Sequence, residues 1–459
     1  MSASRLGAIK ETVSERPARA WRTAYHAAWV FPISSEPVRD GTVLVEDGRI
    51  RWVGPRHAMP DARHAHIAEL GDVILAPGLV NAHTHLDLTA LRGLLDGESF
   101  FGWIRAVVGS RDILSYADQL NSARAGIVEG LEAGITTFAD TSPTATAFDA
   151  MRELGVRGIA YLESFGPDSA QSDASLAELR GRITALRPLE TPLVRLGVSP
   201  HAPYSVSDAL YAAIADFARA ERLPLATHVA ESEAESAFVV EGQGPFAQLL
   251  LARGIGVVPR GRSPVAMLEA DRVLGPDVLL IHCVRCDAAD IATVARSDSA
   301  IVTCPHSNRY FGHGVAPVRA FAAAGVRVAV GTDSMASNTR MDLLAEAHLA
   351  LGGTPDAWPA AWELATLGGA RALGLDDDVG SLEPGKAADL AVFGIPAAES
   401  SGSEAPWAVP PGRRSVMTVV AGIERIRGRR FVGDDAGIIL GAATASARLR
   451  EWRARATTA

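Results

Sequence analysis

Eight short apolar segments recur through the middle of the chain, and helix-like stretches separate them. The segments are Leu79–Leu86, Ile135–Thr141, Arg157–Phe165, Val194–Pro200, Pro224–Ala230, Asp277–Val284, Ala300–Pro305 and Arg327–Thr332. Continuous apolar runs of this length are typical of parallel strands that are buried on both faces, and their alternation with helices is typical of α/β folds. The eight strand–helix units therefore predict a closed, TIM-like (β/α)8 barrel rather than an open doubly wound sheet.

Both ends of the chain show a different pattern, in which short β-like runs alternate with turn signals. An Asp47-Gly48 pair between two such runs predicts a hairpin near the N-terminal end. A similar pattern returns between residues 388 and 426, so we predict one small β-sandwich that both chain ends build. The predicted domains are a flexible tail at 1–18, the composite sandwich at 19–76 plus 377–435, the barrel at 77–376 and a C-terminal helix at 436–459.

The composition limits the possible partners and location. A net charge of -9 argues against nucleic acid as a partner, because non-specific binding to it requires a basic face. No apolar run approaches the ~20 residues that span a bilayer, so we expect no membrane association. With three cysteines and no apolar signal segment near the N-terminus, we expect a reducing, cytoplasmic location. A homodimer is the default expectation for such a barrel.

Polar side chains end several of the predicted strands. In a strand, residues i and i+2 point to the same face, so His83 and His85 would project from the end of the first strand into one small volume. The carboxyl ends of barrel strands meet at one rim, so the polar groups at other strand ends would join them there. Several imidazoles and a carboxylate at one rim predict a divalent-metal site. The residues at these other strand ends are His201, His228, Glu231, His282 and Asp333.

Five sequence motifs resemble those of a known enzyme family. They are Pro77–His85, His228–Glu231, Cys304–Asn308, Gly331–Asn338 and Gly380–Leu390. On these motifs the chain resembles the amidohydrolase superfamily, and in particular its metal-dependent deaminase branch, over about residues 40 to 430. The resemblance implies the same barrel. The runs Asn81–Asp87 and Ser99–Trp103 look like those of aminodeoxyfutalosine deaminases, whereas adenosine, S-adenosylhomocysteine and methylthioadenosine deaminases share nearly all of the same site motifs.

The resemblance implies a role for each residue at the strand ends. The implied metal ligands are His83, His85, His228 and Asp333. Glu231 would be the proton shuttle, His282 would orient the attacking water and the tetrahedral intermediate, and Asp333 would also accept a proton. Such a ligand set holds one divalent ion and leaves a position for water, whose pKa falls towards ~7 on zinc. Zinc is the expected metal, and iron or manganese is an alternative.

The lysine content indicates how many metal ions the site holds. Lys10 and Lys386 are the only lysines, and both lie outside the predicted barrel. The carboxylated lysine that bridges two metals in many hydrolases of this superfamily therefore cannot form. Glu163 is the one candidate for a bridging glutamate, but a contact with solvent or substrate is the favoured interpretation. We therefore predict a mononuclear site.

Three further positions are candidates for contact with the substrate. His201 resembles the substrate-contacting histidine of the deaminase branch, although it could simply cap a turn. The aromatic segment Phe100–Trp103 could form a lid in which Trp103 stacks on a purine, or it could belong to the local core. Arg92 could reach a carboxylate or phosphate of the substrate, or it could pair with an acid on the surface.

Together these features predict an enzyme that hydrolyses C–N bonds. It would deaminate an aminopurine-type nucleoside by attack of metal-activated hydroxide and release ammonia, with a slight preference for aminodeoxyfutalosine, a compound of menaquinone biosynthesis. One alternative is an adenosine, S-adenosylhomocysteine or methylthioadenosine deaminase. Others are a cyclic-amide or triazine-chloride hydrolase on the same scaffold, and a catalytically silent scaffold protein. The intact ligand set together with Glu231 argues against the silent scaffold.

Overall fold

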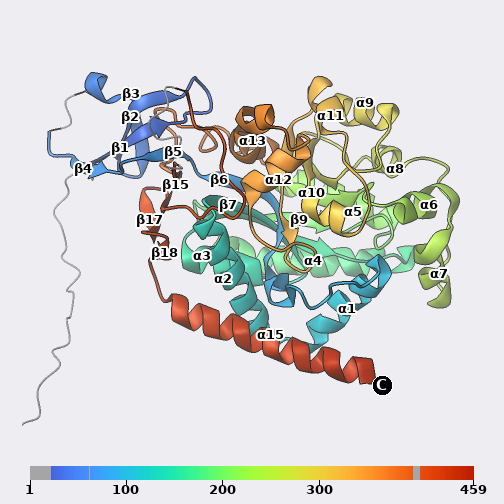
Figure 1. Cartoon of the computed structure of the whole chain (residues 1–459). Helices are drawn as coiled ribbons and strands as arrows, with labels where there is room; N and C mark the ends of the chain where they lie inside the picture. The colour runs from blue at the N-terminus through green and yellow to red at the C-terminus, as the bar shows by residue number, and fades with distance from the viewer. Residues whose placement is uncertain (1–21, 61–62, 396–403, 459) are drawn as a thin grey trace, which may run out of the picture.

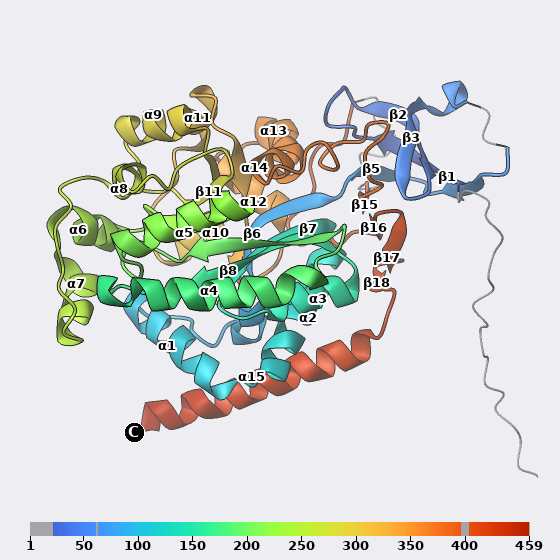
Figure 2. The ribbon, with the colours of Figure 1, turned by 180° about the vertical axis from the view of Figure 1, so that it is seen from behind.

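The computed structural model describes residues 22–60, 63–395 and 404–458, so the predicted tail at 1–18 lies outside the described residues. The chain folds into a barrel surrounded by helices and a mixed sheet beside it (Figures 1 and 2). The C-terminal helix crosses the molecule on the side away from α13 in both views. In the described part of the chain, no helix is long and apolar enough to cross a membrane.

The barrel sheet consists of parallel strands that follow one another in chain order. They are β6 (Leu79–His85), β7 (Ile135–Ser142), β8 (Arg157–Ser164), β9 (Val194–Pro200), β10 (Leu225–Val229), β11 (Val278–His282), β12 (Ala300–Thr303), β13 (Val328–Val330) and β14 (Asp333–Ser334). The barrel fold and its strands are confirmed, with shifts of about one or two residues at some ends. The predictions succeed here because almost every residue of these strands is buried, which gives each strand an apolar run.

The eighth strand differs from its prediction, because residues 331–332 interrupt it between β13 and β14. Beyond the interruption, β14 pairs with β6 in parallel, with Asp333 opposite Thr84. β6 is also paired with β7. The first and last strands of the sheet therefore meet, and the sheet closes on itself as a barrel.

Two local features allow this closure. A Cβ atom on Gly331 would lie 2.7 Å from the carbonyl oxygen of His83, so a larger residue would push the two strands apart. The Asn81 side chain then joins the strands, because its Nδ2 donates to Thr332 Oγ1 at 2.8 Å and its Oδ1 accepts from the Thr332 amide at 3.1 Å. The interruption is thus the point at which the last strand is fastened to the first.

Helices cover the outside of the barrel. They are α1 (Phe100–Ile113), α2 (Tyr116–Glu132), α3 (Thr146–Leu154), α4 (Ser172–Leu186), α5 (Asp208–Glu221), α6 (Glu233–Glu241), α7 (Gly244–Ala252), α8 (Pro264–Ala270), α9 (Ala288–Ser297), α10 (Pro305–Tyr310), α11 (Val318–Ala323), α12 (Leu343–Ala350), α13 (Trp358–Glu363) and α14 (Gly369–Ala372). The aromatic segment after β6 starts α1, where the Ser99 hydroxyl accepts from the Gly102 amide. The predicted alternation of strands and helices places helical structure between β10 and β11, and the structure has three helices there, α6 to α8.

The two chain ends form a mixed sheet, nine-stranded among the described residues. Its strands are β1 (Arg22–Val30), β2 (Val38–Glu46), β3 (Arg49–Pro55), β4 (His66–Glu69), β5 (Val73–Pro77), β15 (Leu390–Gly394), β16 (Met417–Val420), β17 (Ile423–Arg427) and β18 (Arg430–Phe431). The antiparallel pair β5–β15 joins the N-terminal to the C-terminal strands. The prediction that both ends build one β unit is confirmed. The bounds of the predicted domains remain our proposal.

The C-terminal helix α15 (Asp435–Thr458) packs against α2 and α1 and against the turn that follows β6. Its Ala445 and Leu449 are fully buried in a cluster that includes Leu91 of that turn. The Ser446 hydroxyl donates to the carbonyl oxygen of Ala90 at 2.9 Å. This helix therefore supports the segment that leads from β6 to α1.

A buried ion pair connects the barrel to the mixed sheet. Arg157, at the start of β8, donates from Nε and Nη2 to the two carboxylate oxygens of Asp389, at 3.0 and 3.2 Å. Their side chains are only 7% and 2% exposed. The Ala421 amide also donates to Asp389 at 2.8 Å. Because the pair is bidentate and the carboxylate has a third donor, its charges are well compensated.

We predict that Arg157→Met lowers the free energy of unfolding by about 3–5 kcal/mol, because it leaves the Asp389 carboxylate buried without its partner. The denaturation midpoint in urea, followed by circular dichroism, measures the loss. Arg371→Met is the control, because Arg371 pairs with Glu363 at 3.2 Å on the surface, where a pair contributes about 0–1 kcal/mol. Equal losses in the two variants would contradict a structural role for the buried pair.

Candidate active site

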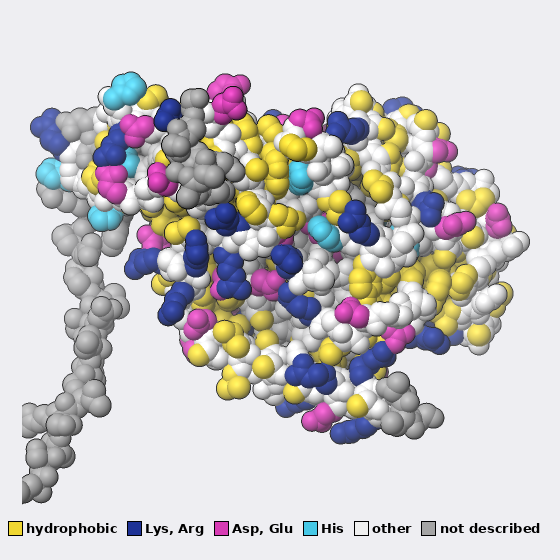
Figure 3. Space-filling view, in the orientation of Figure 1, with side chains coloured by type: hydrophobic (Ala, Val, Ile, Leu, Met, Phe, Trp, Pro, Cys, Tyr) yellow, Lys and Arg dark blue, Asp and Glu magenta, His cyan; other side chains and the backbone are white. Residues whose placement is uncertain are grey.

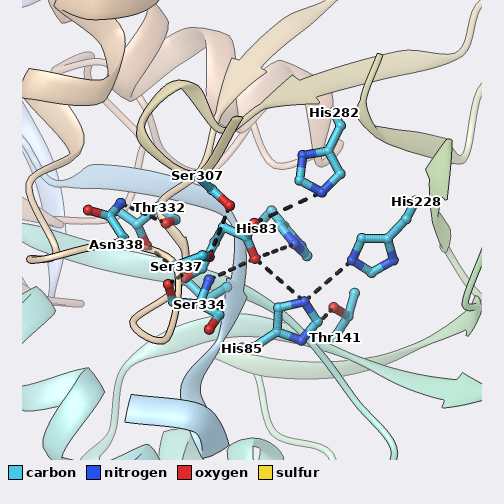
Figure 4. Close-up of polar contacts among 12 residues, drawn as sticks. His83, His85, Thr141, His228, His282, Ser307, Thr332, Ser334, Ser337 and Asn338 are labelled. Atoms are coloured by element: carbon cyan, nitrogen blue, oxygen red, sulfur yellow. Dashed lines mark hydrogen bonds and ion pairs between the residues drawn. The ribbon is translucent and has the colours of Figure 1, made fainter. Parts of the chain in front are cut away.

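Four histidines converge inside the barrel at the carboxyl ends of the strands (Figure 4), and an aspartate lies beside three of them. His83 and His85 come from β6, and their Nε2 atoms lie 3.5 and 3.6 Å from Asp333 Oδ1 on β14. His228 on β10 brings its Nε2 to 3.3 Å from His85 Nε2. His282 on β11 lies with its Nε2 4.0 Å from Asp333 Oδ2. The structure thus brings together every residue that the resemblance implies as a metal ligand.

This cluster fits a divalent metal ion. One ligand atom from each of His83, His85 and His228 lies within 4.8 Å of the others, and the same holds for His83, His282 and Asp333. The Nε2 atom of His83 is buried and has no hydrogen-bond partner among the described residues. A buried nitrogen of this kind is costly unless something binds it. Neutral imidazoles with one carboxylate are the donors that zinc and related ions take. The protein therefore has a buried, histidine-rich metal site.

The electrostatics of the cluster favour a bound cation. Burial lowers the pKa of His83 to about 4 and lowers the pKa of His228 well below its usual range. Burial alone would raise the pKa of Asp333, but the imidazole of His83, 3.5 Å away, and the nearby His282 and His85 hold it well below its usual range. At His85 burial is outweighed by the carboxylates of Glu163 and Asp333, which raise the pKa. Carboxylates that favour a proton at His85 also favour a metal cation there.

Hydrogen bonds to Nδ1 fix the orientation of two imidazole rings of the cluster, those of His228 and His282. His228 donates from Nδ1 to the carbonyl oxygen of His201 at 3.0 Å. His282 Nδ1 lies 3.0 Å from Oδ1 of Asn308, whose amide nitrogen points to Thr303 Oγ1. With Nδ1 occupied in this way, Nε2 of each ring faces the cluster with its lone pair. Such outer hydrogen bonds fix the tautomer and the angle of metal-binding histidines.

Glu231 lies directly after β10, at the edge of the cluster. Its Oε1 is 3.7 Å from His282 Nε2 and 3.5 Å from His313 Nε2, and its amide donates to Glu235 at 2.9 Å. Burial, together with the negative charges of Asp333 and Glu235, raises the pKa of Glu231 well above its usual range. Glu231 is therefore a buried carboxyl group next to the metal site, in surroundings that favour its protonated form. The role of His313 was not predicted from the sequence.

A cavity of about 300 Å³ opens from the cluster toward α1 and α7. This volume lies at the lower end of the range for small-molecule sites. Its floor is polar and its walls are mainly apolar and aromatic. Figure 3 shows hydrophobic side chains gathered on the surface over α6 and α7, where Leu249 and Leu251 are 52% and 59% exposed. The wall residues include Leu88, Phe100, Trp103, Ile104, Val107, Phe165, Tyr204, Phe246, Leu249, Leu250 and Phe311.

Of the three candidate substrate contacts, two line the cavity and one does not. Trp103 lines the cavity and is held by a hydrogen bond from its Nε1 to the carbonyl oxygen of Ala336, at 3.0 Å. His201 also lines the cavity, with its Nδ1 2.7 Å from Ser205 Oγ. Arg92 is not at the cavity.

The Arg92 guanidinium bonds Glu129 at 3.0 Å and the carbonyl oxygen of Thr339 at 2.6 Å. We therefore withdraw Arg92 as a substrate contact. The alternative that the sequence allowed, in which Arg92 pairs with an acidic residue, agrees with its contact to Glu129.

Several cavity residues were missed by the sequence analysis. Arg111 lines the cavity and pairs with Asp87 at 3.0 Å. Its helical spacing from Trp103 and Val107 could have indicated it, because residues four apart share one helix face. Phe246 stacks on Tyr204 with ring centroids 3.8 Å apart. No local signal indicates that contact, since α7 and the end of β9 meet only in the folded chain.

Comparison with known proteins agrees with this site. The model of the Amidohydrolase family matches residues 74–423. A 5-methylthioadenosine/S-adenosylhomocysteine deaminase of Moorella thermoacetica is 32% identical over 382 residues, which cover 79% of this chain and 83% of that relative. An aminodeoxyfutalosine deaminase of Deinococcus radiodurans is 36% identical over 301 residues, which cover 63% of this chain and 70% of that relative.

A solved structure of high similarity is the zinc-bound adenosine deaminase from Xanthomonas campestris. It matches with a TM-score of 0.80 at 27% identity, and the match covers 94% of this chain and 98% of that one. The chain belongs to the amidohydrolase family. It is a metal-dependent hydrolase of that family, acting on C–N bonds.

We predict that His228→Ala loses bound metal and activity together, because it removes one nitrogen from the donor set. The metal affinity should fall by more than the roughly 10- to 100-fold that loss of an outer partner costs. Metal content per chain, measured by mass spectrometry after dialysis, tests this. His348→Ala is the control, since His348 of α12 stacks on Trp358 of α13, with ring centroids 4.1 Å apart, and does not belong to the cluster. Full metal content in His228→Ala would exclude it as a ligand.

Proposed function

We propose that the protein deaminates an adenosine-type nucleoside, with methylthioadenosine and S-adenosylhomocysteine as the favoured substrates. The Moorella relative, whose name carries both compounds, matches over more of this chain than the Deinococcus aminodeoxyfutalosine deaminase. This reverses the slight preference that the sequence motifs suggested. Aminodeoxyfutalosine becomes the second candidate, supported by the higher identity over the shorter match.

The observation that carries the proposal is the position of Glu231. Deamination requires a proton on the ring nitrogen beside the reacting carbon and another on the leaving ammonia. Glu231 is buried beside the metal donors, it is close to His282, and burial raises its pKa, which favours its protonated form. A carboxyl group in this state can give a proton to the ring nitrogen and then pass one to the amino group.

We propose His83, His85, His228 and Asp333 as the ligands of one divalent ion, with zinc favoured because the Xanthomonas structure holds it. When bound, the ion would supply a water that is ionised near neutral pH. Iron and manganese accept the same donors and remain alternatives.

Asp333 and His282 would act on the attacking water. Asp333 is ionised, so its Oδ2 can accept the proton that the attacking water loses. The Nδ1 of His282 is hydrogen-bonded to Asn308, which leaves the lone pair on its Nε2. This Nε2 lies 4.0 Å from Asp333 Oδ2, where it can orient the water. In the balanced reaction, water adds to the ring carbon, the C–N bond breaks, and ammonia leaves. The two protons that the water loses, one of them by way of Asp333, replace those that Glu231 gives to the ring nitrogen and to the amino group.

The cavity walls suit the substrate class. Aromatic rings of Trp103, Phe311 and Phe246 stand above the polar floor and offer faces for a flat heterocycle. Leu249 and Val108 continue the apolar lining to the exposed rim, where an apolar thioether could lie. Predominantly apolar walls with a few convergent polar groups are typical of small-molecule sites.

Ammonia release from a panel of compounds tests the proposal. The panel contains methylthioadenosine, S-adenosylhomocysteine, adenosine, aminodeoxyfutalosine, guanine and cytosine, with metal content measured on the same sample. We expect the fastest turnover with methylthioadenosine or S-adenosylhomocysteine. Turnover of aminodeoxyfutalosine alone would restore the second candidate. No ammonia from any compound, with metal bound, would refute deamination and favour a cyclic-amide or triazine-chloride hydrolase.

We predict that Glu231→Gln keeps its metal but loses about 10²- to 10⁴-fold in kcat, because it removes the proton donor and no ligand. Parallel assays of metal content and ammonia release measure both effects. A variant that loses its metal would instead show that Glu231 is part of the metal site.

A further inference from the structure

Glu163 is a buried carboxyl group that the proposed chemistry does not use. It lies near the end of β8, it is 3% exposed, and it lines the cavity. Its Oε1 atom is fully buried and has no hydrogen-bond partner among the described residues. Buried acceptors are almost always paired, so an unpaired carboxylate oxygen at a cavity indicates a partner that arrives with a ligand.

The surrounding protein holds the backbone of this residue and leaves the carboxyl group free. Arg182 donates to the carbonyl oxygens of Glu163 and Pro143, both at 2.6 Å. Arg111 also lines the cavity, but its guanidinium pairs with Asp87 at 3.0 Å. Among the described residues no cation forms an ion pair with Glu163. The fold therefore fixes the position of this acceptor without satisfying it.

A second metal ion is one possible partner, because a carboxylate oxygen of Glu163 lies within 4.8 Å of a nitrogen of His201 and a nitrogen of His228. Both histidines are already engaged, however. His228 uses Nδ1 to bond the His201 carbonyl oxygen and places Nε2 3.3 Å from His85 Nε2, within the first donor set. A second ion would have to share that nitrogen. A hydrogen-bond donor of the substrate is the simpler partner.

We propose that Glu163 is a substrate-binding residue that accepts hydrogen bonds from the sugar hydroxyl groups of the nucleoside. The inference rests on the proposed function. In an adenosine-type nucleoside the amino group is the only N–H donor of the base, and it must lie at the metal and Glu231 to react. The sugar hydroxyls are the remaining donors that methylthioadenosine, S-adenosylhomocysteine and adenosine share, and two adjacent hydroxyls match the two oxygens of a carboxylate.

This role places the two carboxyl groups at different parts of one ligand. Glu231 contacts His282 and His313, whereas Glu163 lies with His201 and His228. A nucleoside bound between them would present its reacting edge to Glu231 and its sugar to Glu163. The first group acts on the reaction and the second sets the position and specificity of the substrate.

The test compares wild type and Glu163→Gln on methylthioadenosine and adenosine, each with its 2′-deoxy and 3′-deoxy forms. In wild type we expect removal of a hydroxyl to lower kcat/KM by about 10- to 100-fold, as expected for a hydrogen bond to a charged group. Glu163→Gln should lower kcat/KM of the parent nucleosides by a similar factor, mainly through KM. It should change the value for the deoxy form much less, because the hydroxyl and the carboxylate act as a pair.

Glu233→Gln is the matched control, because the Glu233 side chain is 88% exposed and does not line the cavity. It should leave every kcat/KM unchanged. Equal losses on parent and deoxy nucleosides in Glu163→Gln, or wild type that does not distinguish them, would overturn the inference while leaving deamination intact. Loss of metal from Glu163→Gln would also overturn it, by showing a metal ligand. Absence of any nucleoside deamination by wild type would refute the proposed function itself.

Discussion

The whole site depends on closure of the barrel between its first and last strands. Two of the metal donors, His83 and His85, lie on β6, and Asp333 lies on the short β14 that pairs with it. The pairing requires the strands to approach closely at Gly331, where a Cβ atom would meet His83. A shift of one residue in this register would turn the aspartate away from both imidazoles. Backbone pairing, rather than a flexible loop, therefore fixes the distance between imidazoles and carboxylate.

Burying the ionisable groups of the metal site destabilises the folded protein, but it also shifts their pKa values in the direction that the reaction needs. The cluster buries several ionisable groups, and the Nε2 atom of His83 has no hydrogen-bond partner in the described part of the chain. Burial lowers the pKa of His228 and raises that of Glu231, so one environment favours both a neutral imidazole ligand and a protonated acid. A cation in the donor set would neutralise the carboxylate of Asp333 and pair the free nitrogens. The metal then contributes to stability as well as to reactivity.

The sequence predicted the barrel and the convergence at its rim because both depend on local patterns. Buried strands give apolar runs, and the polar residues that end them, such as His228 and Asp333, must meet at one rim of a closed barrel. The substrate cavity was predicted poorly for the opposite reason. The stacking of Phe246 on Tyr204 and the pairing of Arg92 with Glu129 join segments far apart in sequence, and no local pattern encodes them. The sequence singles out Glu163 as a strand-end carboxylate, but only the fold shows that its Oε1 has no hydrogen-bond partner among the described residues.

We propose that a single metal ion, held by His83, His85, His228 and Asp333, makes the protein a nucleoside deaminase. The most direct measurement removes the metal with a chelator and then follows ammonia release from methylthioadenosine during titration with zinc. The account predicts no release without metal and full recovery at about one ion per chain. Undiminished ammonia release by metal-free protein would contradict it, and so would a fully loaded protein that releases none from any adenosine-type nucleoside.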